Sequence, residues 1–464
     1  MRRNTANLII SGLTLVFILL LIIAGWLVLT NLPSRQLSRL PKFVQTWVIP
    51  EPDSALLPTV AFSADEAAAL LGSNATDTPQ VGSILASVTQ TPITPPTATP
   101  IPEPSQTPTL VPIAVNTVIP TPTLIPSPTP NGLPAAYRQT NITYHQQDWN
   151  NCGPATLAMA LSALGTEITQ YDTASFLKPN PEDRNVSPYQ MAQYVNQSTG
   201  FQAAARINGS LELLRTLLAN DFPVILEVGD RAPTEVSWVD SEPDVAYRDW
   251  WGHYLLAAGY DDAIDELWVY NSLIWDIASE TNTSSGHPYS YTDLLTFWPQ
   301  FNSSYVVLYT PEREDELNMI LGESVDPQIM WQQALEKNQL ALQNRQEDPF
   351  LWFNLGSSYT RLGQYEQAVT AFDKARSIGL PWRMLWYQFE LYEAYYEMGR
   401  YDDIILLANA TLNGRPYFEE SFYWRGQAYA ALGNDANARN DYQAAVNFQP
   451  YFQPAVDALQ HLDS

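Results

Sequence analysis

The pattern of apolar and polar positions divides the 464-residue chain into four segments. An uninterrupted apolar run near the N-terminus is followed by a proline-rich segment with scarcely a charge. Residues 136–312 alternate short apolar runs, typical of strands, with helical patterns, and residues 326–464 show helical periodicity alone. We therefore predict a multi-domain chain with an N-terminal transmembrane helix, an α+β domain and a C-terminal all-α domain, because its length exceeds that of one ordinary core.

The apolar run from Leu8 to Leu32 contains no charged residue. At ~1.5 Å per residue, a helix of this length spans the ~30 Å hydrocarbon core of a bilayer. A secretory signal peptide has a shorter apolar region, roughly 7–15 residues, and Ala24-Gly25-Trp26 is a poor version of its cleavage site. Residues 1–34 are therefore predicted to be a short tail and a membrane anchor, with a cleaved signal peptide as the alternative.

The next segment, residues 35–135, is predicted to be a mostly disordered stalk. Residues 91–134 contain 14 Pro and 10 Thr, and such a chain is extended, at about 3.1 Å per residue. Basic residues flank the apolar run on both sides, so their count does not orient the helix. Because Thr/Pro stalks commonly stand on the outer face of a membrane, we expect a single-pass cell-membrane protein with extracytoplasmic C-terminal domains. A cytoplasmic linker of the same composition is the alternative.

The chain contains one cysteine, Cys152, which comes just before a run of good helix formers from Ala155 to Leu164. Pro154 suits the first turn of that helix, and Gly165 suits its C-terminal end. Cys152 is thus predicted at a helix N-terminus, where free N–H groups and the helix dipole favour the thiolate and can stabilise an oxyanion. The side-chain amide of Gln146 could donate to the same oxyanion.

A β-hairpin is predicted where the runs YLLAAGY and ELWVYNS are joined by a short acidic turn. His253 near the start of the first strand and Asn271 near the end of the second can then lie side by side. In that arrangement His253 can accept the thiol proton, and Asn271 can hold the imidazole. Asp276 is the alternative to Asn271, whereas Asp261 and Asp262 are interpreted as turn residues.

These segments follow one another in an order that resembles the bacteriocin-processing cysteine peptidases, which remove double-glycine leaders. The resemblance rests on Gln146, on Asn151–Ala155, on the histidine strand Gly252–Asp262 and on the strand Leu267–Trp275. It covers roughly residues 137–310 and implies a papain-like cysteine peptidase domain.

The resemblance implies catalytic roles for Cys152 as nucleophile, His253 as base, Asn271 as the residue that orients the base and Gln146 as an oxyanion donor. Asn271 stands where many members of the family carry Asp. The expected activity is hydrolysis of peptide bonds in an unidentified peptide or protein substrate. The alternatives are a catalytically silent binding module and an acyltransferase or amide-forming enzyme that uses the same Cys/His pair.

Two other histidines and one long segment have weaker interpretations. His145 is interpreted as a packing or rim residue, and His287 as a loop residue. Residues 229–251 form an acidic, Trp-rich segment directly before the histidine strand. A segment of this length is either a lid or substrate wall, or a packed surface flap.

Residues 326–464 carry a pattern with a period near 34 residues. The run WFNLGSSY (residues 352–359), followed by Ala368 and Phe372, resembles the tetratricopeptide repeat. We predict three helical hairpins, preceded by a helix over residues 329–345. Such arrays usually hold a peptide or protein segment in a concave groove, so the resemblance implies a protein partner there.

Composition narrows the range of partners. The chain has 49 acidic and 23 basic residues, for a formal net charge of −26. This charge argues against nucleic acid and against docking on anionic lipid headgroups. One cysteine and four histidines provide no metal-ligand cluster, and no Gly-rich loop has phosphate-binding spacing. No cofactor is therefore expected.

Overall fold

The described residues of the computed structural model are 56–60, 70, 132–231, 250–273 and 286–463. The predicted membrane anchor, nearly all of the predicted stalk and most of the predicted lid fall outside these ranges. Within them, no helix is long and apolar enough to cross a membrane. The chain that follows the predicted stalk belongs to one compact unit.

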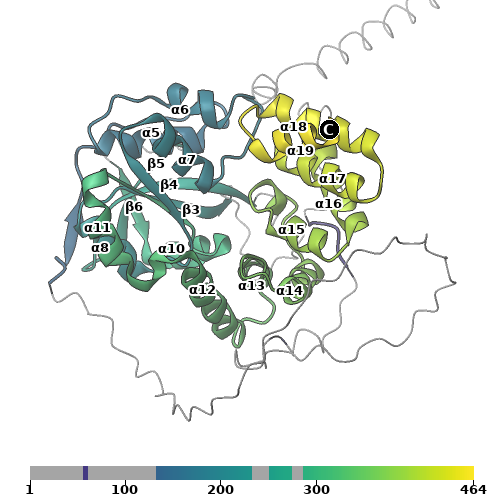
Figure 1. Cartoon of the computed structure of the whole chain (residues 1–464). Helices are drawn as coiled ribbons and strands as arrows, with labels where there is room; N and C mark the ends of the chain where they lie inside the picture. The colour runs from purple at the N-terminus through teal and green to yellow at the C-terminus, as the bar shows by residue number, and fades with distance from the viewer. Residues whose placement is uncertain (1–55, 61–69, 71–131, 232–249, 274–285, 464) are drawn as a thin grey trace, which may run out of the picture. The chain divides into compact units, whose positions relative to one another are not determined.

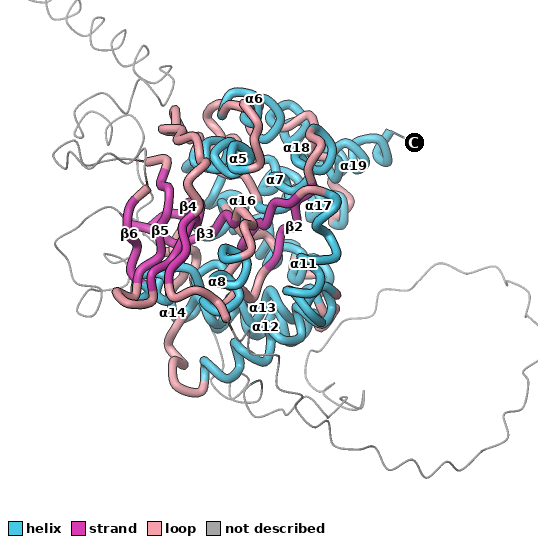
Figure 2. The backbone as a smooth tube through the Cα atoms, turned by 90° about the vertical axis from the view of Figure 1, so that its left-hand side faces the viewer, coloured by secondary structure: helices cyan, strands magenta, loops and turns pink. Residues whose placement is uncertain are grey.

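Seven strands form one sheet in which neighbouring strands are antiparallel. The strand order is β2-β7-β3-β4-β5-β6, and β1 also pairs with β4. Figure 2 shows β6, β5, β4 and β3 side by side, and the predicted hairpin is formed by β4 and β5. The strands are β1 (Ala136–Arg138), β2 (Gln202–Arg206), β3 (Val224–Arg231), β4 (Trp250–Asp261), β5 (Glu266–Asn271), β6 (His287–Ser290) and β7 (Tyr305–Tyr309).

Helices cover both faces of this sheet (Figure 1). Tyr254 and Leu256 of β4 enter the core beneath α5, α6 and α7, whereas Leu255 and Ala257 enter the core formed with α8, α10 and α11. This alternation is the two-residue period of a strand. The antiparallel sheet with helices on both faces (Figure 1) confirms the predicted α+β class. The helices are α5 (Cys152–Ala163), α6 (Gln170–Leu177), α7 (Pro188–Ser198), α8 (Leu211–Ala219), α10 (Tyr291–Phe297) and α11 (Glu314–Leu321).

Helix α5 lies at the centre of the α+β domain. It begins at Cys152, and every residue of the helix after Cys152 is buried. Gly165 follows its end with φ of 87°, a left-handed conformation that glycine adopts without steric cost. A helix that is apolar on all sides has no face for solvent, so it packs as an interior element.

The C-terminal region is all-helical, as predicted. The helix expected over residues 329–345 is α12, and helical hairpins follow it, beginning with α13 and α14. The helices are α12 (Pro327–Leu342), α13 (Pro349–Arg361), α14 (Tyr365–Ile378), α15 (Glu390–Glu397), α16 (Tyr401–Gly414), α17 (Glu419–Ala431), α18 (Asp435–Phe448) and α19 (Gln453–Asp463). Short 3₁₀ helices occur at η2 (Trp298–Phe301), η3 (Pro311–Arg313), η4 (Gly322–Val325) and η5 (Met384–Trp386).

One hydrophobic core joins the repeat helices to the sheet domain. Trp250 and Phe301 of the sheet domain belong to the same cluster of buried side chains as the repeat helices. Asn354 of α13 donates from Nδ2 to the Pro299 carbonyl at 2.7 Å, and Arg383 donates from Nη1 to the Trp250 carbonyl at 2.7 Å. Helix α13 of the first repeat therefore packs against the chain's own sheet domain.

A short part of the predicted stalk packs on the repeats. Leu57 is 3% exposed, and its N–H donates to the Leu380 carbonyl at 2.9 Å. Arg376 donates from Nε to the Pro58 carbonyl at 3.0 Å. Burial of the Leu57 side chain provides a physical reason for order in this stretch, which the composition of the surrounding segment did not indicate.

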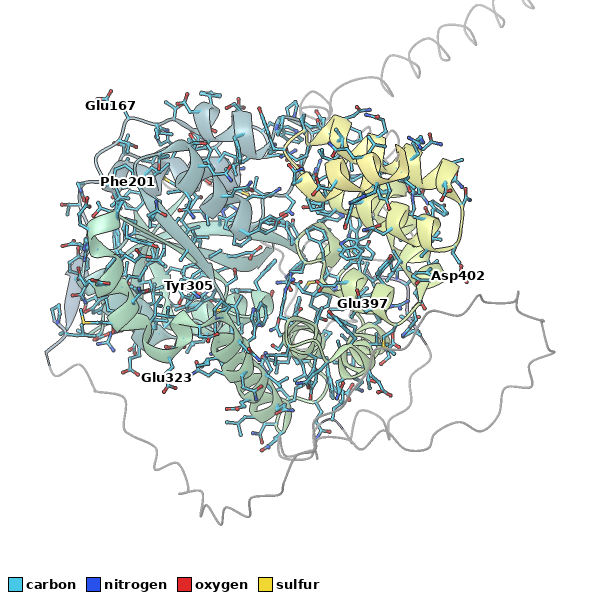
Figure 3. The ribbon with its side chains drawn as sticks, viewed as in Figure 1. Glu167, Phe201, Tyr305, Glu323, Glu397 and Asp402 are labelled. Atoms are coloured by element: carbon cyan, nitrogen blue, oxygen red, sulfur yellow. The ribbon has the colours of Figure 1, made fainter. Side chains whose placement is uncertain are left out.

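Of the four acidic side chains labelled in Figure 3, Glu167, Glu323 and Asp402 lie at the edge of the molecule in this view. Glu167, Glu323, Glu397 and Asp402 are all exposed. Acidic side chains at such positions keep their hydration, so the large negative charge is compatible with folding and favours solubility.

Gly356 provides a test of the repeat packing. A Cβ atom at this position would lie 2.7 Å from two ring carbons of Phe372, so Gly356→Ala should lower the free energy of unfolding by about 1–3 kcal/mol. Gly200→Ala is the matched control, because a Cβ there meets nothing within 4 Å. Urea unfolding of both variants measures the difference, and equal midpoints would contradict the described packing.

Glu227 provides a test of the sheet core. Burial raises its pKa to about 8 from an ordinary value of 4.5, although hydrogen bonds with Ser304 and Tyr254 oppose the shift. The folded chain thus holds a proton that the unfolded chain releases between pH 4.5 and 8, so this group makes the unfolding free energy fall as pH rises across that window. We expect Glu227→Gln to make that fall shallower in unfolding measurements at pH 5 and pH 8. An unchanged slope would contradict this account.

Candidate active site

Cys152 is half-buried at the start of helix α5. The side chain of Asn151, the N-cap residue, makes no capping hydrogen bond to the N–H groups of the first turn. The first turns of the helix pack on strand β4, where Thr156 donates from Oγ1 to the Tyr254 carbonyl at 3.4 Å. His253 directly precedes Tyr254 on β4. Cys152, the predicted nucleophile, therefore begins the helix that packs on the strand carrying His253, the predicted base.

His253 and Asn271 are in contact, as predicted. Nε2 of His253 lies 2.8 Å from Oδ1 of Asn271. In the register of β4 and β5, Asn271 is opposite Leu255, and His253 is two residues from Leu255 on the same strand face. The antiparallel pairing therefore brings the two side chains together.

The hydrogen bonds around Asn271 determine which nitrogen of His253 carries the proton. Oδ1 of Asn271 also accepts the N–H of Leu273 at 2.8 Å, which identifies this atom as the amide oxygen. The oxygen of a side-chain amide can only accept a hydrogen bond, so Nε2 of the neutral His253 ring carries the proton and donates to it. Nδ1 is then the ring nitrogen that can accept a proton.

The loop before Cys152 is held beside the end of strand β5. The Gln147 N–H donates to the Ser272 carbonyl at 2.9 Å, and Ser272 Oγ donates to Oε1 of Gln147 at 3.0 Å. The side chain of Gln146 is exposed. The structure therefore places Gln146, with an exposed side chain, on the loop that pairs with the residue after Asn271.

Two buried polar residues beside this loop escaped the sequence analysis. Gln170 and Lys178, at the two ends of helix α6, hydrogen-bond to main-chain groups of residues 146–150. Lys178 is 4% exposed, although a lysine after a helix normally indicates a solvated side chain that interacts with the helix dipole. No periodicity marks such a residue, because its burial depends on a loop that folds back over it.

The other candidate residues of the sequence analysis are structural or lie outside the described ranges. Burial lowers the pKa of both His145 and His287, so both favour the neutral form, and His287 begins strand β6 rather than lying in a loop. Asp262 pairs with Arg215 after the end of β4, whereas Asp276 is not described. Among the described residues, no group of three or more His, Cys, Asp or Glu side chains could hold a metal ion.

A segment of the repeat region lies next to the histidine strand. The ring of Tyr387 is 5.9 Å from that of Trp250, and its hydroxyl is hydrogen-bonded by the backbone of Gly252. Burial raises the pKa of Tyr387 to about 12. His253 itself is 2% exposed, so the candidate base lies in a largely dry environment beside the repeats.

Comparison with known proteins supports both halves of this architecture. Residues 138–306 match the model of the Peptidase_C39 like family, and residues 349–378 and 419–452 match tetratricopeptide repeat models. A solved structure described as a C39-like peptidase from Bacillus anthracis aligns with 38% of this chain and 97% of its own, at 15% identity and a TM-score of 0.28.

Curated relatives match over a shorter stretch. Tetratricopeptide repeat protein 16 of Homo sapiens is 29% identical over 129 residues, which are 26% of this chain and 15% of that protein. Its counterpart in Macaca fascicularis is 28% identical over the same length. The chain thus spans a small part of these relatives, and their likeness concerns a limited segment.

The family matches and the structure agree that the sheet domain comes first in the chain and the repeat helices follow it. Cys152, His253 and Asn271 all fall within the matched residues 138–306, and the helical hairpins fall where the repeat models match. The chain carries a Peptidase_C39-like domain followed by tetratricopeptide repeats.

Proposed function

We propose that this chain is a cysteine peptidase that hydrolyses peptide bonds of a peptide or protein substrate. One observation carries the proposal: His253, oriented by Asn271 at 2.8 Å, lies on the strand against which the helix of Cys152 packs. A nucleophile at a helix N-terminus, a base and a residue that orients the base are the set that thiol-based acyl chemistry requires. The match to a peptidase-like family favours hydrolysis as the reaction.

The proposed mechanism gives each of these groups a defined role. Nδ1 of His253 accepts the thiol proton, and the Cys152 thiolate attacks the peptide carbonyl to form a tetrahedral oxyanion. The Cys152 N–H and the Gln146 amide donate to that oxyanion. The imidazolium returns the proton to the leaving amine, which leaves a thioester on Cys152.

Water completes the reaction. His253 accepts a proton from water as it attacks the thioester carbonyl, and the thiolate leaves and is reprotonated. Asn271 accepts the Nε2–H bond throughout and so keeps Nδ1 directed at the reacting atoms. The net reaction consumes one peptide bond and one water molecule.

The setting of the chemistry is a further part of the proposal. We assign the apolar run Leu8–Leu32 as a single-pass anchor of the cell membrane and place the peptidase-like domain outside the membrane. The support is the length of the run and the Pro/Thr-rich composition of residues 91–134. We assign a protein-binding role to the repeats, through surfaces other than the part of α13 that contacts the sheet domain.

The first test of this function is labelling by a thiol-reactive peptide probe, for example a peptidyl epoxide. Wild type should be labelled at Cys152, and Cys152→Ala should not. His253→Ala should label roughly 10²–10⁴-fold more slowly, because the general base is lost. Equal labelling of wild type and His253→Ala would overturn the pairing, and failure to cleave any peptide of a broad library would favour a silent binding module.

The second test concerns Asn271. Asn271→Ala removes the acceptor for Nε2–H and should lower kcat/KM about tenfold, the effect of losing one hydrogen bond worth ~1.4 kcal/mol. Asn271→Asp keeps an acceptor at the same place and should retain most of the activity. Steady-state kinetics on one cleaved peptide gives the comparison, and equal losses in the two variants would contradict the orienting role.

A further inference from the structure

Helix α6 contacts the loop before Cys152 with both of its ends. Gln170 is its first residue and Lys178 is its C-cap residue. Both side chains are buried, at 6% and 4% exposure, and both bind main-chain atoms of residues 146–150. The helix thus spans the loop that carries Gln146 and leads into Cys152.

The amide of Gln170 bridges the two halves of this loop. Nε2 donates to the Gln146 carbonyl at 2.7 Å, and Oε1 accepts the Asp148 N–H at 2.8 Å. Oε1 also accepts from Nδ2 of Asn151 at 3.2 Å. One side chain therefore connects the predicted oxyanion donor with the residue before the nucleophile.

The ammonium of Lys178 holds the loop from the other end. Nζ lies 3.2 Å from the Asn150 carbonyl and 3.4 Å from the Trp149 carbonyl, and it also donates to the carbonyls of Pro181 and Asp183 at 3.0 and 2.8 Å. Asn150 has a φ of 54°, an uncommon conformation that needs support from its surroundings. The bonds to Trp149 and Asn150 supply such support directly before Asn151 and Cys152.

A buried ammonium is costly, so its charge calls for an explanation. Carbonyl dipoles compensate part of the desolvation cost, but a neutral donor could satisfy the same carbonyls without burying a charge. Asp183 is the charged group that favours the Lys178 ammonium most and Cys152 is the next, whereas Arg184 opposes the ammonium and Glu182 has the smallest effect. Of the two largest, Cys152 is the one that changes its charge during the proposed reaction.

We propose that Gln170 and Lys178 are positioning residues for the nucleophile loop, and that the buried Lys178 ammonium also stabilises the Cys152 thiolate. This inference rests on the proposed function and names the groups that prepare its nucleophile. Gln170 fixes the loop through neutral hydrogen bonds, whereas Lys178 contributes hydrogen bonds and a charge. The two residues should therefore affect different observables.

The charge on Lys178 depends on pH within an accessible range. Burial lowers its pKa to about 8, while Asp183 and the Cys152 thiolate raise it in opposition. The ammonium is therefore present below about pH 8 and is lost above it. Its support of the thiolate is greatest at neutral and mildly acidic pH.

The single cysteine allows a direct test, because alkylation of the full chain by iodoacetamide reports on Cys152 alone. The rate is measured by mass spectrometry from pH 5 to pH 10 for wild type, Lys178→Gln, Lys178→Arg and Gln170→Leu. Lys178→Gln keeps a donor without the charge, so the midpoint of the rate profile should move up by about one pH unit and the rate at pH 6 should fall about tenfold. Lys178→Arg should keep the wild-type midpoint.

Gln170→Leu is the matched neutral change. It should leave the alkylation midpoint where it is and lower kcat/KM for a cleaved peptide. If Lys178→Gln does not fold, Lys178→Met provides the same removal of charge. An unchanged midpoint in a folded Lys178 variant overturns the role assigned to the charge, and an unchanged kcat/KM in Gln170→Leu overturns the role assigned to the amide.

Alkylation does not require peptide cleavage, so the two proposals fail separately. A shifted midpoint in a chain that cleaves no peptide would overturn the proposed function and leave this inference standing. Cleavage by wild type together with an unshifted alkylation midpoint in Lys178→Gln would support the proposed function and overturn the role assigned to the Lys178 charge.

Discussion

The packing of helix α5 on strand β4 is the contact on which the candidate site depends. It places the helix that begins at Cys152 on the strand that carries His253, although the two residues are about a hundred positions apart in the chain. The helix is buried on all sides, and alternate side chains of β4 fill cores on both faces of the sheet. A slip of β4 by one residue would exchange those faces and move His253 away from Asn271, so the hydrophobic pattern that specifies the sheet also specifies the site.

Much of this arrangement follows from local patterns in the sequence. Residues around Cys152 indicated the start of a helix, and the two runs that became β4 and β5 indicated a hairpin with His253 and Asn271 near each other. The repeat motif indicated helical hairpins. In each case a short stretch, with a fixed period or a fixed capping residue, contains the whole signal.

Other features depend on contacts between segments that are distant in the chain, and no local pattern reports them. Lys178 looks like an ordinary lysine after a helix, and only the return of the loop at Trp149 and Asn150 buries it. The sharing of one core between Trp250 and the repeat helices is equally invisible in either segment alone. This shared core makes the repeats part of the environment of His253, in addition to any binding of partners.

In the proposed reaction, Cys152 forms an acyl intermediate with the help of His253, and trapping of that intermediate would reveal the chemistry itself. Acid quenching during a single turnover with a cleaved peptide, followed by mass spectrometry, detects a thioester on Cys152. The account predicts that the adduct forms in wild type before the second product appears, and that it forms far more slowly in His253→Ala. Cleavage without an adduct on Cys152, or with undiminished adduct formation in His253→Ala, would contradict it.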